Sequence, residues 1–209
     1  MAGLSAHGLT CVKRDRVLFA DLSFTLQAGS LTYLRGPNGA GKTSLLRLLT
    51  GLSLPDQGEI LFNDVPIAEC LPQFHASLTY IGHKPGLNGA LSAIENLQYW
   101  CAQHSIGFSL DTAYKVLTTL GLVGLEDIPI RMLSAGQQRR VALARLWLKS
   151  ADIWILDEPF TALDVNGIKL LETHMRSHVE QGGTVITTSH QALSEVAGPV
   201  TLLDLEYRI

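Results

Sequence analysis

One short segment says more about this chain than any other: Gly36-Pro37-Asn38-Gly39-Ala40-Gly41-Lys42-Thr43. It follows an apolar run at 31–34 that is typical of a buried strand, and it opens a leucine-rich segment at 43–50 with helical periodicity. Glycines let such a loop wrap a phosphate chain without Cβ clashes, and amides at the helix start donate hydrogen bonds to it. The alternative is a glycine-rich turn that only caps a helix, but the full spacing and both flanking elements favour a phosphate-binding loop, hereafter the P-loop.

The side chains at the end of the P-loop have the chemistry that a nucleoside triphosphate requires. We expect Lys42 to place its charge against the β- and γ-phosphates, and the Thr43 hydroxyl to ligate Mg²⁺. Ser44 can assist through its own amide or hydroxyl. The segment therefore predicts that the chain binds ATP together with Mg²⁺.

Two further apolar runs, rich in β-branched or aromatic residues, occur at 153–156 and 184–187. Because neither they nor the run at 31–34 alternates cleanly with polar residues, all suit strands buried on both faces. Helix-period segments, including 43–50 and 134–149, separate them. Strands that alternate with helices indicate an α/β fold with a mainly parallel core sheet.

Other patterns predict additions to this core. Residues 58–67 read as strand, Asn63-Asp64 turn and strand, and residues 18–26 alternate polar with apolar, which predicts a small antiparallel β layer. Helix-period segments at 93–103 and 110–120 replace the strand signals and predict an inserted helical subdomain.

The length of the chain limits it to one compact domain. Its 209 residues are enough for one well-buried core and too few for two ordinary ones. We therefore expect a single domain over 1–209, with a core at about 1–84 and 150–209 and the helical subdomain at about 85–149.

Two adjacent carboxylates follow the strand predicted at 153–156. Asp157 is expected to hold Mg²⁺ through water, and Glu158 to position and deprotonate an attacking water, the general-base role. Side chains alternate along an extended strand, so the two carboxylates should point apart. The alternative is an ordinary solvated acidic turn, which the presence of a P-loop disfavours.

His190 follows the strand predicted at 184–187. A histidine at the carboxyl edge of a parallel sheet would lie where open α/β sheets bind ligands, and it could contact a γ-phosphate. A lone histidine is more often a packed or surface residue, so this role depends on the neighbouring motifs.

A further motif, Leu133-Ser134-Ala135-Gly136-Gln137, precedes the acidic strand. Ser134 and Gln137 have the spacing of a capping box at a helix start, which leaves amides, a helix dipole and the narrow Gly136 facing outward. This arrangement predicts a second phosphate site, although any capped helix can begin in the same way.

Together these motifs resemble the ABC ATPase family, and the resemblance covers essentially Leu9–Asp204. It implies that the P-loop is the Walker A loop, that Asp157 is the Walker B carboxylate and that Glu158 is the catalytic base. It also implies that Ala162-Leu163-Asp164 is the D-loop and that His190 is the switch histidine.

In this family the signature motif (133–137) faces the P-loop of another subunit. The resemblance therefore implies that two copies of this chain sandwich two ATP molecules in a head-to-tail dimer. Ala135 stands where glycine is more usual, and His83 is the expected equivalent of the absent Q-loop glutamine. The aromatic residue that stacks on adenine is also absent, and a cation–π contact is expected in its place from Lys13, Arg14 or Arg16.

Several further segments are distinctive within the family: Leu9-Thr10-Cys11, 14–19, Gly82-His83-Lys84-Pro85-Gly86, 133–148 and 156–164. These details are most similar to the ATP-binding subunit of the haem exporter of bacterial cytochrome c biogenesis. This resemblance implies integral membrane partners, ATP hydrolysis coupled to haem delivery, and a peripheral location at the cytoplasmic face of the inner membrane. Another cargo, or a soluble ABC protein, is the alternative.

Composition excludes several other classes. The net charge is only -3 and there is no long basic run, so we expect no nucleic-acid partner. No run approaches the roughly 18 to 20 apolar residues of a membrane-spanning helix. Residues 1–10 lack the pattern of a secretory signal, which predicts a cytoplasmic protein. The chain also lacks the long coiled coil of chromosome-type ABC proteins and the second cassette of ribosome-acting ones.

The cysteines and two helical histidines offer no strong metal site. Cys11, Cys70 and Cys101 lie far apart, without zinc or redox spacing, and are expected to be reduced packing residues. His174 and His178 are spaced to share a helix face, but a solvated face is the expected state rather than metal binding.

Overall fold

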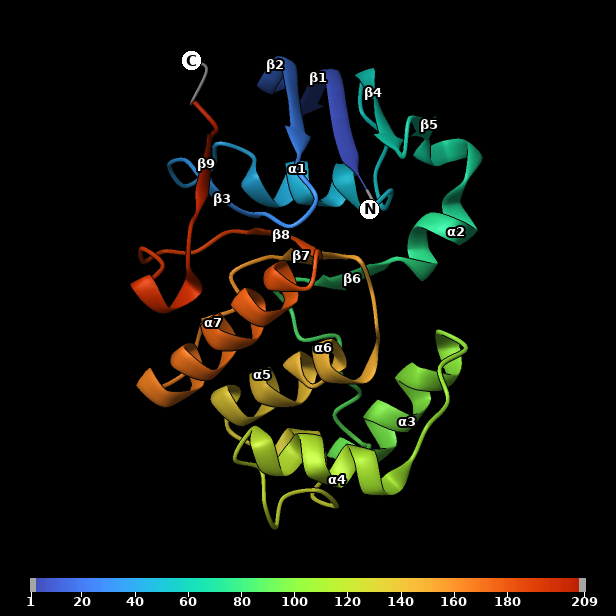
Figure 1. The fold of residues 1–209 in the computed structure, drawn as a ribbon, viewed down its shortest axis with the longest axis vertical. Helices are drawn as coiled ribbons and strands as arrows, with labels where there is room; N and C mark the ends of the chain where they lie inside the picture. The colour runs from blue at the N-terminus through green and yellow to red at the C-terminus, as the bar shows by residue number, and fades with distance from the viewer. Residues whose placement is uncertain (1–2, 207–209) are drawn as a thin grey trace. The chain divides into compact units, whose positions relative to one another are not determined.

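The computed structural model of the chain describes residues 3–206. Two compact units make it up. The core unit contains the chain up to Tyr80, Ala151–Glu158 and the chain from Glu172 on, and the helical unit contains Ile81–Ser150 and Pro159–Leu171. Figure 1 labels the helices and strands of both units.

The central sheet has the strand order β6-β7-β8-β3-β9. The strands predicted at 153–156 and 184–187 are confirmed as β7 (Ile153–Leu156) and β8 (Thr184–Thr187), and β3 (Leu31–Arg35) ends one residue later than predicted. β8 pairs in parallel with both β7 and β3, so these strands end at the same edge. All residues of β7 and β8 are buried, as expected for strands covered on both faces. The sheet is completed by β6 (Leu78–Ile81) and β9 (Thr201–Asp204).

A second, antiparallel sheet has the order β2-β1-β4-β5. Its strands are β1 (Leu4–Lys13), β2 (Arg16–Leu26), β4 (Gln57–Phe62) and β5 (Val65–Pro66). The predicted turn at Asn63-Asp64 is confirmed, with φ of 52° and 64°. Arg14-Asp15 makes the same kind of two-residue turn between β1 and β2. The predicted antiparallel layer is therefore present, although Ile67 begins a short 3-10 helix (Ile67–Glu69) instead of ending a strand.

Helix α1 (Lys42–Leu49) packs against residues of both sheets in the core of this unit. Its buried leucines belong to one apolar cluster with residues of both sheets, among them Ile155, Ile186 and Phe62. Figure 1 shows α1 beside the antiparallel strands. Full burial of a leucine contributes roughly 1.5 to 3 kcal/mol, so this helix is fixed firmly and its N-terminus, where the P-loop ends, is fixed with it. The short α2 (Leu71–Ala76) completes the unit up to Tyr80.

The helical unit contains α3 (Ala93–Gln103), α4 (Leu110–Thr119), α5 (Ala135–Leu143) and α6 (Arg145–Leu148) around its own apolar core. The helices predicted at 93–103 and 110–120 are confirmed. The segment predicted at 134–149 is helical but is interrupted at Ala144, whose N–H bonds to the carbonyls of both Arg140 and Val141. α7 (Val165–Glu180) runs from the helical unit into the core unit.

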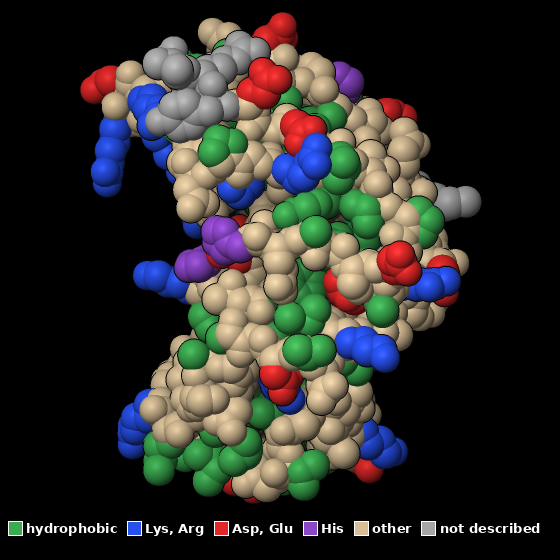
Figure 2. All heavy atoms as spheres, turned by 90° about the vertical axis from the view of Figure 1, so that its left-hand side faces the viewer, with side chains coloured by type: hydrophobic (Ala, Val, Ile, Leu, Met, Phe, Trp, Pro, Cys, Tyr) green, Lys and Arg blue, Asp and Glu red, His purple; other side chains and the backbone are tan. Residues whose placement is uncertain are grey.

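Charged side chains and cysteines are distributed along residues 3–206 without a strong local cluster of either kind. Basic and acidic side chains are interspersed on the face drawn in Figure 2. Cys11, Cys70 and Cys101 are free thiols, and burial raises the pKa of Cys11 and Cys101. Among residues 3–206, no helix is both long enough and apolar enough to cross a membrane.

Candidate active site

The P-loop connects β3 to α1 with backbone conformations that only glycine adopts freely. Gly36 has a φ of 152°, and a Cβ there would lie 2.5 Å from the Leu205 carbonyl oxygen. Gly41 has a φ of 102° and caps α1 without a side-chain hydrogen bond. Because the first amides of a helix lack partners within it, these N–H groups remain to be used by the loop or by a ligand. The geometry is that of an anion-binding loop.

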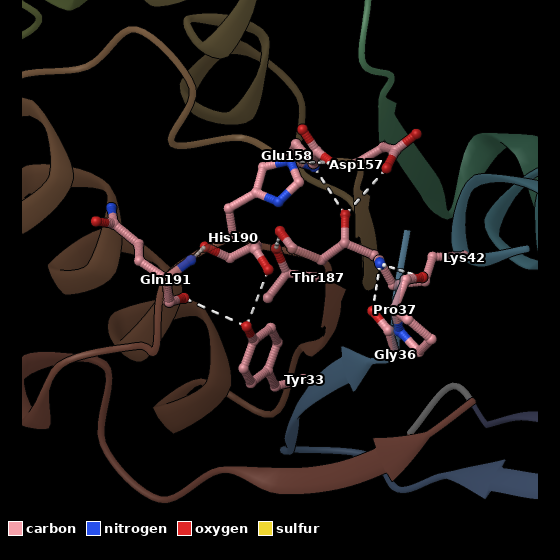
Figure 3. Close-up of polar contacts among 11 residues, drawn as sticks. Tyr33, Gly36, Pro37, Lys42, Asp157, Glu158, Thr187, His190 and Gln191 are labelled. Atoms are coloured by element: carbon pink, nitrogen blue, oxygen red, sulfur yellow. Dashed lines mark hydrogen bonds and ion pairs between the residues drawn. The ribbon is translucent and has the colours of Figure 1, made fainter. Parts of the chain in front are cut away.

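Lys42 lies over the loop that it ends. Its Nζ donates to the carbonyl oxygens of Gly36 at 2.5 Å and Pro37 at 3.2 Å, as Figure 3 shows. Among the remaining predicted loop residues Asn38, Gly39 and Thr43 are exposed, whereas Ala40 and Ser44 are buried. The exposed Thr43 hydroxyl can reach a ligand directly, whereas Ser44 is left mainly with its backbone amide.

Asp157 and Glu158 lie just beyond the carboxyl end of β7. Asp157 is almost completely buried, with 1% of its surface exposed, and its Oδ1 accepts a hydrogen bond from the Thr188 hydroxyl at 2.9 Å. Glu158 has a φ of 50°, in the left-handed region. The predicted reason for the two carboxylates to point apart, alternation along an extended strand, is wrong, because β7 already ends at Leu156 and the chain turns at Glu158.

His190 contacts the second of these carboxylates. Its Nε2 lies 2.9 Å from Glu158 Oε1, and Figure 3 shows the two side chains pointing toward one another. A carboxylate can only accept a hydrogen bond, so the Nε2–H of the imidazole is the donor. The Glu158 side chain is 17% exposed and the His190 side chain 61%. His190 is thus neither a packed core residue nor an isolated surface one.

Tyr33, which belongs to none of the sequence motifs, holds the loop that carries His190. Its hydroxyl lies 2.9 Å from the Ser189 carbonyl oxygen and 3.3 Å from that of Gln191, one on each side of the histidine. Burial raises the pKa of Tyr33, so it keeps the proton that these bonds need. Its position inside an apolar strand gave no signal of this role.

The signature motif lies in the helical unit and opens α5 as predicted. The capping box is confirmed: Ser134 Oγ accepts from the Gln137 N–H at 3.2 Å, and Gln137 Oε1 accepts from the Ser134 N–H at 2.8 Å. Gly136 packs against a second segment, because a Cβ there would lie 2.5 Å from the Ala162 carbonyl oxygen. Glycine at this position therefore allows the two segments to pack closely.

Arginines of α5 tie this helix to neighbouring segments. Arg140 donates to the Leu120 carbonyl oxygen at 2.8 Å and to Asp164 Oδ1 at 2.6 Å. The Gly167 amide, which donates to the same oxygen at 2.8 Å, and the Arg140 guanidinium hold the pKa of Asp164 below its usual value. The segment 162–164 is thereby held at its Asp164 end.

Arg139, which was not among the predicted site residues, is buried, with 4% of its surface exposed. It donates to the carbonyl oxygens of Pro159 at 3.2 Å and Gly82 at 2.8 Å. Gly82 directly precedes His83, the expected Q-loop equivalent, whose side chain is exposed. One buried guanidinium therefore holds both the start of this loop and the residue after Glu158.

The comparisons with known proteins agree with these motifs. A model described as ABC transporter matches residues 19–161. The chain belongs to the ABC transporter family. Its P-loop, signature motif and acidic pair all lie in the matched range, and the chain is an ATPase subunit of the ABC type.

Relatives and solved structures extend the ABC match over nearly the whole chain. The cytochrome c biogenesis ATP-binding export protein CcmA of Escherichia coli K12 is 51% identical over 207 residues, which cover 98% of this chain and 97% of that protein. A putative ABC transporter ATP-binding protein of Pyrococcus furiosus has a TM-score of 0.82 at 25% identity, covering 97% of each chain. An ATP-binding cassette solved as a dimer with ADP and Pi has the same fold, with a TM-score of 0.81 at 21% identity over 99% of this chain and 97% of that chain.

The paired histidines of α7 are not on a solvated face, contrary to the prediction. The His178 ring stacks on Trp154, with centroids 3.8 Å apart and planes 3° from parallel. Burial lowers the pKa of His178 to about 4, so the ring is neutral near pH 7. His174 lies 5.0 Å from the same indole ring. Both rings pack against β7 in the core unit.

Proposed function

We propose that this ABC ATPase serves an export complex of cytochrome c biogenesis and couples ATP hydrolysis to haem delivery. The observation that carries the proposal is the 51% identity to the Escherichia coli export protein, which extends over 98% of this chain. A transporter for another cargo is the alternative. In the proposed complex the chain associates with integral membrane subunits at the cytoplasmic face of the inner membrane. The core and helical units act together as one cassette over 1–209.

The nucleotide is held by the P-loop in this proposal. The backbone N–H groups of 36–43, except at Pro37, which has none, surround the phosphates, and Lys42 exchanges its loop carbonyls for the β- and γ-phosphate oxygens. Magnesium fits the same edge of the sheet, because the exposed Thr43 hydroxyl and the buried Asp157 carboxylate are the hard oxygen donors that it prefers. When bound, Mg²⁺ neutralises charge on the phosphates. Arg14, at the exposed turn between β1 and β2, is the neighbour we propose for the adenine ring, with Lys13 and Arg16 beside it.

Hydrolysis is assigned to Glu158 and His190. Glu158 takes a proton from the attacking water, the water oxygen bonds to the γ-phosphorus, and the bond to the β-phosphate bridging oxygen breaks with its electron pair leaving on ADP. His190, 2.9 Å from Glu158 Oε1, orients the carboxylate and is placed to contact the γ-phosphate. The strained φ of 50° at Glu158 supports this role, since such conformations gather at active sites.

A second copy completes the site. Ser134, Gly136 and Gln137 of one copy are proposed to cover the nucleotide on the P-loop of the other, with the α5 N-terminus directed at the phosphates. Support comes from the intact capping box and from the related cassette that was solved as a dimer with ADP and Pi. No nucleic acid takes part in this scheme.

Glu158→Gln tests the enzymatic assignment. Loss of a general base is expected to slow hydrolysis by about 10² to 10⁴-fold while ATP still binds, so ATP should trap a dimer visible by sedimentation. Lys42→Ala is the matched control, because it should lose ATP binding by calorimetry and stay monomeric. Wild-type hydrolysis by Glu158→Gln, or only monomers with ATP, would refute the assignment.

The cargo requires a separate experiment. The native protein should sediment with membranes through integral partners, and mild detergent should release the complex intact. Identification of the co-purifying integral proteins and of bound haem then tests the haem assignment. A protein that stays wholly soluble when all candidate partners are present would contradict transport altogether.

A further inference from the structure

Thr188 is the first residue beyond β8 and is completely buried, with 0% of its surface exposed. Its backbone N–H donates to the Leu156 carbonyl oxygen at 3.0 Å, which continues the pairing of β8 with β7 by one residue. This bond fixes Thr188 directly beside the point where β7 ends and the acidic pair begins. Groups held by sheet backbone are positioned more accurately than groups on a free loop.

The Thr188 hydroxyl is used twice at this point. It donates to Asp157 Oδ1 at 2.9 Å and accepts the N–H of Glu158 at 2.8 Å. One oxygen therefore fixes the side chain of the first carboxylate and the backbone of the second. The bond to the backbone matters because Glu158 has a φ of 50°, which residues with a Cβ rarely adopt without support.

Neighbouring hydroxyls are committed elsewhere. Thr187 Oγ1 donates to the Thr188 carbonyl oxygen at 3.2 Å, and Ser189 Oγ accepts the Gln191 N–H at 3.1 Å. Tyr33 holds the carbonyls of Ser189 and Gln191 on either side of His190. Tyr33 thus holds the part of this segment that carries His190, and Thr188 is the residue of the segment whose hydroxyl contacts both acidic residues.

We propose that Thr188 is a positioning residue for hydrolysis: its hydroxyl orients the Asp157 carboxylate and holds Glu158 in its left-handed conformation. This inference rests on the roles proposed above for Asp157 and Glu158. Thr188 itself touches neither the nucleotide nor the attacking water. Thr188 therefore affects the hydrolysis step, which uses both carboxylates. It does not affect the affinity for nucleotide without Mg²⁺, because the P-loop sets that affinity.

The test compares Thr188→Val, which keeps the shape and removes the hydroxyl, with Thr188→Ser, which keeps the hydroxyl. For Thr188→Val, kcat falls about 10- to 100-fold because a misplaced catalytic group of this kind costs that much, and KM for ATP changes less than threefold. Thr188→Ser restores most of kcat. Thr187→Val is the matched control, since among residues 3–206 the hydroxyl that it removes bonds only to the Thr188 carbonyl oxygen, and its kcat stays within threefold of wild type.

Two readouts separate positioning from a general effect on folding. In the first, calorimetry measures how much Mg²⁺ increases the affinity for ATP. This increase is expected to be smaller in Thr188→Val and unchanged in Thr187→Val, and the affinity without Mg²⁺ is expected to be the same in both variants. The backbone amide resonance of Glu158 shifts in Thr188→Val and returns in Thr188→Ser. Thr188→Ala replaces Thr188→Val in every measurement should the valine variant fail to fold.

Two results would overturn the inference. One is a Thr188→Val variant with wild-type kcat and a wild-type effect of Mg²⁺ on ATP affinity. The other is a Thr188→Ser variant that loses as much kcat as Thr188→Val, which would assign the effect to packing of the methyl group. Glu158→Gln is measured in parallel to keep the two proposals apart. A slow Glu158→Gln with a normal Thr188→Val removes only the role of Thr188, whereas a normal Glu158→Gln removes the assignment on which it rests.

Discussion

Gly136→Ala adds a single methyl group where the signature motif meets the segment that begins at Ala162. The added Cβ would lie 2.5 Å from the Ala162 carbonyl oxygen. Ordinary contacts of this kind begin at about 3.4 Å and 3.0 Å is already tight, so the two backbones must separate by roughly 0.5 to 0.9 Å. The clash is with backbone, which cannot rotate away. Ala162 has a φ of 63°, and Asp164, two residues further, is held by Arg140, so the segment has little freedom to adjust.

The expected cost follows from these distances. Overpacking of this kind costs about 1 to 3 kcal/mol, and the better helix propensity of alanine offsets about 0.5 to 1 kcal/mol of that. The net loss is therefore at most about 2.5 kcal/mol, with a central value of about 1 kcal/mol, or roughly 2 to 4 °C in Tm for a domain of this size. Displacement by up to 1 Å near a reacting phosphate is expected to reduce ATP hydrolysis by about 10- to 100-fold.

Thermal unfolding and steady-state ATP hydrolysis measure the two effects. Ala135→Gly is the matched control, since it removes a methyl from the adjacent, exposed residue and should cost no more than about 1 kcal/mol with hydrolysis within threefold of wild type. If Gly136→Ala kept both wild-type Tm and wild-type hydrolysis, the close packing of residues 136 and 162 would not matter and the reasoning would be refuted.

The remaining predictions concern the α7 histidine. In Gly183→Ala the new Cβ would overlap the His178 ring, which is fixed against Trp154, so the unfolding free energy should fall by about 1 to 3 kcal/mol. Gly107→Ala is the control, because no described atom lies within 4 Å of its added Cβ, and it should change the unfolding free energy by less than about 1 kcal/mol. Equal effects of the two substitutions would contradict the role assigned to the His178 ring. The stability should also depend on pH through His178, because burial lowers its pKa to about 4 in the folded state while the unfolded chain takes up the proton near 6.5. The folded state therefore loses stability as pH falls from about 6.5 toward 4, by at most about 3 kcal/mol from linkage and about half of that after allowing for partial solvent access. Urea unfolding of wild type and His178→Gln at pH 7 and pH 5 checks this, and identical pH dependence in both would exclude the effect.

The regular parts of the fold were readable from the sequence because local pattern and tertiary position agree there. β7 and β8 match the predicted runs residue by residue, since strands buried on both faces show as continuous apolar segments. α3 begins at its Ser92 capping box and also matches. β9 was missed because it is an edge strand of only four residues, Thr201–Asp204, and most of them are exposed, unlike the residues of the buried strands.

The candidate site was predictable only as far as it lies in motifs. The P-loop, the acidic pair and the signature motif are each contiguous, so their spacing identifies them. Thr188 and Arg139 act through contacts to segments 31 and 20 residues away, and nothing local distinguishes them from ordinary strand and helix residues. Such partners follow from sheet order and helix packing, which one sequence does not specify.

His178 shows that helical spacing alone does not identify the surroundings of a side chain. Its spacing from His174 is real, but period alone cannot say whether a helix face meets water or a core. The stacked Trp154 lies on β7, far away in sequence, and it decides that the ring is packed and neutral. A pattern of histidines is therefore weak evidence for a metal until the opposing surface is known.

The sharing of one ATP between two copies is tested most directly by intermolecular crosslinking. Chains carrying Asn38→Cys in the P-loop are mixed with chains carrying Ala135→Cys in the signature motif, both in the Glu158→Gln background, and treated with a short thiol-reactive crosslinker. Both positions are exposed, and neither belongs to the capping box. A crosslinked heterodimer that forms with ATP, and neither with ADP nor in either variant alone, is the predicted result. Absence of the heterodimer at saturating ATP would contradict the account.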